Sequence, residues 1–269
     1  MGAIPPVPAA GAPQARPLLS MKGVEKRFDT GTLALSGFNL EVEAGSFVSL
    51  LGPSGCGKST VLRLVAGLAA PTRGLIQWSD RKAGAAGRSK PRLSFVFQEP
   101  TLMPWATVLA NVMLPFKFSG VPATEARERA RESLRTVGLA SFENAFPREL
   151  SGGMKMRASL ARALITEPET LLLDEPFAAL DEITRFRLTS DLAELWRARR
   201  FTAIFVTHSV FESVFLSQRV VVMATRPGRV FADLPVDAPM ERGDAFRTSQ
   251  AYAEVCRGVS EALKKAMGA

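Results

Sequence analysis

The stretch F-V-S-L-L-G-P-S-G-C-G-K-S-T, from Phe47 to Thr60, decides the fold of this chain. Its first five residues are nearly all apolar and predict a buried strand. The remainder contains the full pattern G-x-x-x-x-G-K-[ST], and apolar residues on one face after Lys58 predict a helix. A strand, a glycine-rich loop and a helix in this order form a phosphate-binding loop. The loop N–H groups and the positive end of the helix dipole face the same anion.

We therefore predict that this loop binds the phosphates of a nucleoside triphosphate. Lys58 would reach the β- and γ-phosphates, and the Ser59 hydroxyl would be a ligand of Mg²⁺. A chance glycine-rich turn is the alternative, and the flanking strand and helix argue against it. The predicted nucleotide-binding residues of the loop are Gly52, Pro53, Ser54, Gly55, Cys56, Gly57, Lys58, Ser59 and Thr60.

An acidic pair follows a second apolar run, L-L-L-D-E-P, which begins at Leu171. Asp174 and Glu175 would lie at the carboxyl end of a buried strand, the edge at which open α/β sheets bind ligands. We expect Asp174 to hold Mg²⁺ and Glu175 to act on the attacking water as a general base or its orienter. An acidic helix cap would explain D-E-P alone, and the phosphate loop upstream favours the functional interpretation.

Two further polar residues also follow apolar strands. Gln98 comes directly after the predicted strand 93–97, and its amide oxygen could bind Mg²⁺ or position water. His208, the only histidine, comes shortly after the predicted strand 202–206 and could contact the γ-phosphate. An ordinary loop glutamine and a structural turn histidine are the alternatives. We predict Glu175, His208 and Gln98 as catalytic residues, and Ser59, Gln98 and Asp174 as metal ligands.

A second anion-binding helix start is predicted at L-S-G-G, from Leu150 to Gly153. Ser151 would cap a helix whose free N–H groups, beside Gly152 and Gly153, suit an anion. One γ-phosphate could use both helix starts if two chains pair head to tail. A plain capped helix is the alternative, because S-G-G is common in turns.

Strands that alternate with helices predict an α/β fold with a parallel sheet covered on both faces. Strands are also expected at 18–28 and 33–42, a helical insert between Gln98 and Pro147, and an amphipathic helical tail after Gly243. Residues 1–17, rich in Ala, Pro and Gly, are expected to be a disordered leader and lack the apolar core of a signal peptide.

Composition restricts the class of protein. The 269 residues include 34 basic and 26 acidic ones, for a net charge of +8. A solvated arginine-rich surface, an anionic membrane face and nucleic acid are the three explanations of this charge. No run of 18 apolar residues predicts a transmembrane helix. The two cysteines, Cys56 and Cys256, favour a reducing cytoplasm, because a disulfide at Cys56 would obstruct the loop.

Together these segments resemble the ATP-binding subunit of ABC transporters, over about Leu18 to Asp237. Residues 52–60 look like its Walker A loop, Gln98 its Q-loop glutamine, 150–153 its signature, 171–175 its Walker B strand and His208 its switch histidine. Residues 179–181 resemble its D-loop. The resemblance implies that Phe28 stacks on adenine and that Ser151, Gly152, Gly153 and Asp181 complete the nucleotide site.

The resemblance also implies a more detailed architecture. It is a P-loop NTPase core of the RecA-like kind, with a parallel sheet, an N-terminal antiparallel β subdomain and a helical insert subdomain. The expected ATPase domain covers residues 18–240, with the helical subdomain at about 99–160, and a helical tail covers 241–269. Met154, in place of the common Gln, and Ala178, in place of Ser, depart from the family pattern. Neither removes an anion-binding backbone group.

The segments L-M-P-W, from Leu102, and V-V-V-M-A-T-R-P-G-R, from Val220, are similar to importers of nitrate, sulfonate, taurine and related anions. This branch implies ATP and Mg²⁺ as cofactors and a subunit on the cytoplasmic face of the inner membrane. Its partners would be a second copy, transmembrane permease subunits and, indirectly, a periplasmic or extracellular solute-binding protein, with no nucleic acid. Thr101–Trp105 would dock a permease helix, or else pack internally. The alternative functions are a soluble ABC-type ATPase acting on nucleic acid or ribosomes, and a non-catalytic ATP-gated scaffold.

Overall fold

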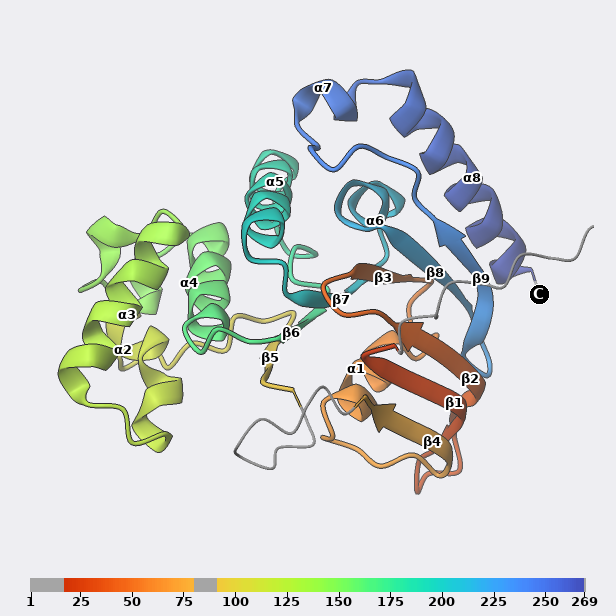
Figure 1. Cartoon of the computed structure of the whole chain (residues 1–269), viewed down its shortest axis with the longest axis horizontal. Helices are drawn as coiled ribbons and strands as arrows, with labels where there is room; N and C mark the ends of the chain where they lie inside the picture. The colour runs from red at the N-terminus through yellow and green to blue at the C-terminus, as the bar shows by residue number, and fades with distance from the viewer. Residues whose placement is uncertain (1–16, 80–90, 269) are drawn as a thin grey trace, which may run out of the picture.

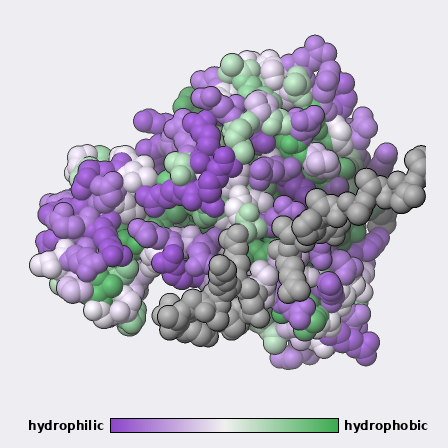
Figure 2. All heavy atoms as spheres, viewed as in Figure 1, coloured by the Kyte–Doolittle hydropathy of each residue, from purple (hydrophilic) through white to green (hydrophobic). Residues whose placement is uncertain are grey.

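The computed structural model describes residues 17–79 and 91–268 (Figure 1). The predicted leader, residues 1–17, therefore lies almost wholly outside the described residues. Among the described residues, no helix combines the length and the apolar character needed to cross a bilayer. Hydrophilic residues cover most of the face shown in Figure 2, with small hydrophobic areas between them.

The centre of the molecule is a six-stranded sheet with the order β5-β6-β7-β3-β8-β9. Five strands are parallel, as predicted, and β9 pairs antiparallel with β8. Its strands are β3 (Phe47–Leu51), β5 (Leu93–Val96), β6 (Thr170–Asp174), β7 (Thr202–Thr207), β8 (Arg219–Ala224) and β9 (Arg229–Pro235). Every residue of β3 and β7 is buried, because helices or a second sheet cover both faces.

Alternate residues of each central strand serve two separate cores. Phe47 and Leu51 of β3 face the core shared with the helices α5 (Glu182–Arg199), α6 (Val210–Leu216) and α8 (Gln250–Met267). Val48 and Leu50 face the other core, which includes α1 (Lys58–Val65) and the antiparallel sheet. Because side chains alternate across a strand, a continuous apolar run is what a sheet with two covered faces requires.

The antiparallel sheet has the order β2-β1-β4 and packs on the same side as α1 (Figure 1). It consists of β1 (Leu19–Arg27), β2 (Leu33–Val42) and β4 (Arg73–Trp78). The first two agree with the predicted strands to within a residue. The third was not predicted from the sequence.

The predicted helical insert is a group of helices beyond β5, at one side of the sheet (Figure 1). Its longest members are α3 (Ala123–Thr136) and α4 (Gly152–Leu164), which pack against each other. The shorter ones are α2 (Val108–Val112) and the 3-10 turns η1 (Leu114–Phe118), η2 (Ala140–Phe142) and η3 (Pro147–Glu149). Buried Ala126, Ala130 and Leu134, spaced four residues apart, form the inner face of α3.

The C-terminal tail is helical, as its apolar spacing predicted. It contains α7 (Asp244–Arg247) and α8, whose buried residues include Tyr252, Cys256 and Val259. Helix α8 lies against β8 and α6, so the tail adds a layer to one face of the main sheet.

Candidate nucleotide-binding site

The loop between β3 and α1 presents free backbone donors at a helix start. Gly57 is the N-cap of α1 at φ +94°, and Gly55 lies at φ +79°, conformations that favour glycine. A Cβ at Gly57 would also come within 2.8 Å of the Leu35 side chain. Because Gly57 has no side chain to cap the helix, the first N–H groups of α1 remain available to an anion.

The Lys58 ammonium is aimed back into this loop. Its Nζ donates to Gly52 O at 2.7 Å and to Pro53 O at 3.1 Å, and it lies 3.4 Å from Glu175 Oε1. The side chain is 4% exposed. A buried cation held by carbonyls and one carboxylate is a strong electrostatic partner for phosphate oxygens.

The acidic pair stands where the sequence predicted it, at the carboxyl end of β6. Ser59 Oγ donates to Asp174 Oδ1 at 2.9 Å, so two of the three predicted metal ligands are in contact. Burial raises the pKa of Asp174, and the Ser59 hydrogen bond opposes this shift. These two oxygens suit Mg²⁺, which prefers oxygen ligands.

Glu175 connects the loop to His208. Its Oε2 lies 3.3 Å from His208 Nδ1, while Oε1 faces Lys58. Glu175 has a φ of +46°, a left-handed conformation that costs on the order of 1 kcal/mol for such a residue. Its N–H donates to Val206 O at 3.0 Å, which holds the strained backbone against β7. Strain retained by a neighbouring strand is common where a side chain must be aimed.

A cleft of about 570 Å³ joins half of the predicted site residues. Phe28, at the end of β1 and 41% exposed, and Gln98, after β5, both line it with the loop and Glu175. The lining residues are Phe28, Thr32, Leu33, Ala34, Ser54, Gly55, Gly57, Lys58, Ser59, Thr60, Gln98, Glu175 and Arg226. Arg226 and the segment 32–34 were not predicted as site residues, although Arg226 is a cation at the cleft.

Three predicted loop residues, Gly52, Pro53 and Cys56, do not line the cleft. The Cys56 side chain is 1% exposed and points into the core, and burial raises the pKa of its thiol. A Cβ at Gly52 would lie 2.7 Å from Cys56 Sγ, so the loop is packed closely from behind. Pro53 contributes its carbonyl to Lys58. Any contact of Cys56 with phosphate is therefore confined to its backbone.

The signature turn and Asp181 lie apart from this cleft. Ser151 caps α4 by accepting from the Met154 N–H at 3.3 Å, as predicted. A Cβ at Gly152 would lie 3.6 Å from Leu180 Cδ2, so the turn packs beside the segment that precedes α5. Asp181 caps α5 by accepting from the Thr184 N–H at 2.9 Å, which lowers its pKa. None of these groups is among the residues that line the cleft.

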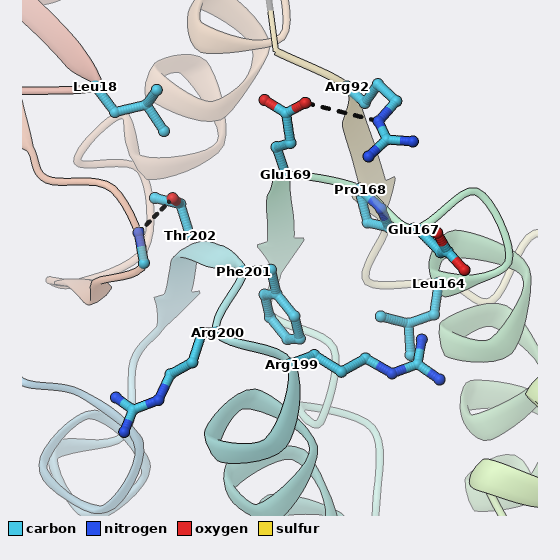
Figure 3. A pocket seen from close by; sticks show the side chains of 11 residues that line it. Leu18, Arg92, Leu164, Glu167, Pro168, Glu169, Arg199, Arg200, Phe201 and Thr202 are labelled. Carbon is cyan, nitrogen blue, oxygen red and sulfur yellow. Dashed lines mark hydrogen bonds and ion pairs between the residues drawn. The ribbon is translucent and has the colours of Figure 1, made fainter. Parts of the chain in front are cut away.

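A separate hollow of about 540 Å³ lies at the opposite, amino edge of the main sheet (Figure 3). Figure 3 shows the Arg92–Glu169 ion pair, 3.7 Å from Nε to Oε1, and Thr202 near the start of β7. None of the predicted site residues lines this hollow. Most of its lining residues lie just before or at the start of parallel strands, whereas the phosphate loop, Gln98 and Glu175 of the nucleotide cleft follow such strands, so the two cavities are at opposite ends of the strands.

Comparisons with known proteins identify the family of the chain. The family model described as "ABC transporter" matches residues 35–178. An aliphatic sulfonates import ATP-binding protein of Mesorhizobium japonicum is 46% identical over 245 residues, or 90% of this chain and 88% of that protein. A dimeric ABC transporter cassette is similar in structure, with a TM-score of 0.70 and 32% identity over 82% of this chain and 100% of the cassette.

A further solved structure, a cassette in a post-hydrolysis state bound to ADP and Pi, has a TM-score of 0.70 and 33% identity. It covers 82% of this chain and all of that cassette. The family match spans more than half of the chain and includes the phosphate loop, Gln98, the signature and the acidic pair. The chain belongs to the family of ABC transporter ATP-binding proteins.

Proposed function

We propose that this chain is the ATP-hydrolysing subunit that energises a membrane importer for a small anionic solute such as nitrate, a sulfonate or taurine. The observation that carries the proposal is Glu175, held between Lys58 and His208 at the open side of the phosphate loop. A carboxylate in that place can accept a proton from water that attacks the γ-phosphate. The similarity to sulfonate import ATP-binding proteins supports the choice of solute class.

Each predicted residue has a role in this proposal. The Phe28 ring would stack on adenine, while the N–H groups of 52–60 and Lys58 hold the phosphates. Ser59, Asp174 and Gln98 would hold Mg²⁺, which neutralises charge on the phosphate oxygens. Glu175 orients and deprotonates the attacking water, and His208 fixes Glu175 and contacts the γ-phosphate.

The second half of the site would come from another copy of the chain. Ser151, Gly152 and Gly153 form an anion-binding helix start outside the cleft of their own chain, beside the segment that ends in Asp181. A head-to-tail pair would place this start on the partner's γ-phosphate, with Asp181 near the same contact. The dimeric structure of a similar cassette supports this arrangement.

The loop after Gln98 is the proposed docking surface for a permease helix. Trp105 is 76% exposed, while Leu102 packs partly against the core. Arg162 of α4 donates to Pro100 O at 2.8 Å and to Thr101 O at 2.9 Å, and these bonds anchor the backbone of the loop to α4. An exposed tryptophan on an anchored loop suits an apolar partner. The proposed place of the subunit is the cytoplasmic face of the inner membrane, and a solute-binding protein would act indirectly through the permease.

The domain boundaries stay part of the proposal: an ATPase domain at 18–240, with its helical subdomain at about 99–160, and a helical tail at 241–269. An ATPase that acts on nucleic acid or ribosomes is not favoured, because several relatives are import ATP-binding proteins. A non-catalytic scaffold is disfavoured by the intact pair of Glu175 and His208.

The test is Glu175→Gln, which keeps the side-chain shape and removes the base. We expect hydrolysis to fall by about 10²–10⁴-fold, with ATP binding retained and the ATP-bound dimer made longer-lived. Steady-state phosphate release and nucleotide titration measure the two effects separately. Near-normal phosphate release in this variant would refute the role of Glu175.

A further inference from the structure

A series of contacts, most of them polar, runs from the signature turn to the residue before His208. It begins at Leu180, whose side chain packs beside Gly152, and it continues through Arg185 of α5 and Glu212 of α6. It ends at Thr207, the residue before His208. None of its four members belongs to the predicted catalytic or metal-binding set.

The first part of this series of contacts, made by Arg185, fixes the segment before α5. Arg185 Nη2 donates to Leu180 O at 2.8 Å, so the guanidinium holds the backbone directly before Asp181. Arg185 Nε is buried and lies 3.6 Å from Glu212 Oε1, with no closer hydrogen-bond partner. This nitrogen depends on the Glu212 carboxylate for its charge partner.

The second part fixes the turn that carries His208. Glu212 Oε2 accepts from the Thr207 hydroxyl at 2.5 Å, and Thr207 Oγ1 in turn accepts from the Ser209 N–H at 3.0 Å. The Glu212 N–H donates to Ser209 Oγ at 3.3 Å, which closes the cap of α6. Thr207 and Ser209, on both sides of His208, are therefore both tied to Glu212: Thr207 through the carboxylate, and Ser209 through the backbone N–H of Glu212 and the Thr207 hydroxyl.

Residues of the C-terminal tail also hydrogen-bond to α6, at its last turn and near its start. Arg242, from the segment after β9, donates through Nη1 to the carbonyls of Val214, Phe215 and Ser217 at 2.7–3.0 Å. Tyr252 of α8 donates to Phe211 O at 2.9 Å. Helix α6 is thus held by the tail at both ends, and its first turn is also tied to Thr207 through Glu212.

Burial of this carboxylate is costly for a purely structural purpose. Glu212 is 8% exposed, and desolvation raises its pKa although Thr207 and Arg185 oppose the shift. Buried ion pairs often contribute little to stability compared with apolar side chains of similar size. Their geometry, by contrast, is directional, and this one joins two segments that serve the nucleotide.

We propose that Arg185 and Glu212 are positioning residues that hold His208 in register with the signature turn of the same chain. The inference rests on the proposed function. In a head-to-tail pair, this turn contacts the partner's nucleotide and His208 contacts the chain's own. The contacts would then link the state of one nucleotide site to hydrolysis at the other.

The experiment compares Thr207→Val with Thr207→Ser in the full chain. Valine has the shape of threonine without the hydroxyl, whereas serine keeps the hydroxyl. We expect Thr207→Val to lower kcat about tenfold or more, because a misplacement on the order of 1 Å is costly in catalysis. Thr207→Ser should retain most of the activity. The Kd for ATP should change less than about twofold in both variants, because Thr207 does not line the cleft.

Glu212→Gln, Arg185→Gln and their combination extend the test. If the pair acts as one unit, the double variant is no slower than the slower single variant. Arg131→Gln is the matched control, because it breaks another Arg–Glu pair, 2.9 Å from Nε to Glu143 Oε2, in the helical insert. Its kcat should stay within about twofold of the wild type.

Three results would overturn the inference. Wild-type kcat in Thr207→Val and Glu212→Gln would show that the contacts do not position His208. A parallel loss of melting temperature, ATP affinity and kcat in all the variants would show a purely structural role. A wild-type chain that hydrolyses no ATP would remove the proposed function as well, so the two failures are distinguishable.

Discussion

The helix starts of α1 and α4 are both suited to anions, yet the chain equips them differently. Gly57 leaves the first N–H groups of α1 free, and Lys58, Asp174 and Glu175 gather around them. At α4, Ser151 already accepts from the Met154 N–H, and the glycines pack against Leu180 and Thr184 of the same chain. The comparison indicates one half-site with its own charged groups and a second half-site that requires a partner.

The largest effect is expected at the first helix start, from Lys58→Ala. This change removes a buried cation and leaves the Glu175 carboxylate with His208 as its remaining partner. We expect ATP affinity to fall about 100-fold, because charge-assisted contacts to phosphate are among the strongest in proteins. Isothermal titration with ATP measures this loss. Binding close to that of the wild type would contradict the account of the loop.

A smaller and different effect is expected at the second helix start, from Gly152→Asp. A side chain fits there, since a Cβ would meet Leu180 Cδ2 at an ordinary 3.6 Å, and an acidic residue suits the first turn of a helix. The added charge should repel a partner's triphosphate. We expect ATP affinity of the single chain to stay within about twofold and the ATP-dependent dimer to be lost.

Light scattering with ATP measures that dimer, and Gly152→Ala is the control that adds a Cβ without a charge. Retention of the dimer in Gly152→Asp, or its loss in both variants, would show that the turn does not face the partner's phosphates.

The smallest effect is expected at the edge of the cleft, from Phe28→Ala. Loss of the half-exposed ring should lower ATP affinity about tenfold, because one stacked base contributes on the order of 1–3 kcal/mol. Phe28→Tyr keeps the ring face and should bind normally. Equal affinities for ATP and for triphosphate alone in the wild type would contradict the stacking role.

Local sequence patterns predicted the central strands and the phosphate loop, because each depends on residues close together in the chain. The apolar run 47–51 and the pattern after it required no long-range information. The same holds for Asp174, Glu175 and His208, which follow apolar strands whose carboxyl ends meet at one edge. The order of the strands and the antiparallel β9 could not be read in the same way.

Arg226 and β4 show what local patterns miss. Arg226 reaches the cleft because Gly228 approaches two distant segments, donating to Ala34 O at 3.0 Å, and a Cβ there would lie 2.1 Å from Cys56 O. Strand β4 is largely exposed or half-buried and has no strict alternation. Its place beside β1 depends on Gly74, where a Cβ would lie 2.4 Å from Gly23 O. Such close approaches between distant segments are invisible to a local pattern.

The most direct test of the paired half-sites mixes two inactive chains, Lys58→Ala and Gly152→Asp. A head-to-tail mixed pair joins the intact phosphate loop of one chain to the intact signature of the other, at one of its two sites. An equal mixture should therefore hydrolyse ATP severalfold faster than either variant alone, since each mixed pair has one complete site. Phosphate release no greater than that of either variant alone would contradict the shared nucleotide site.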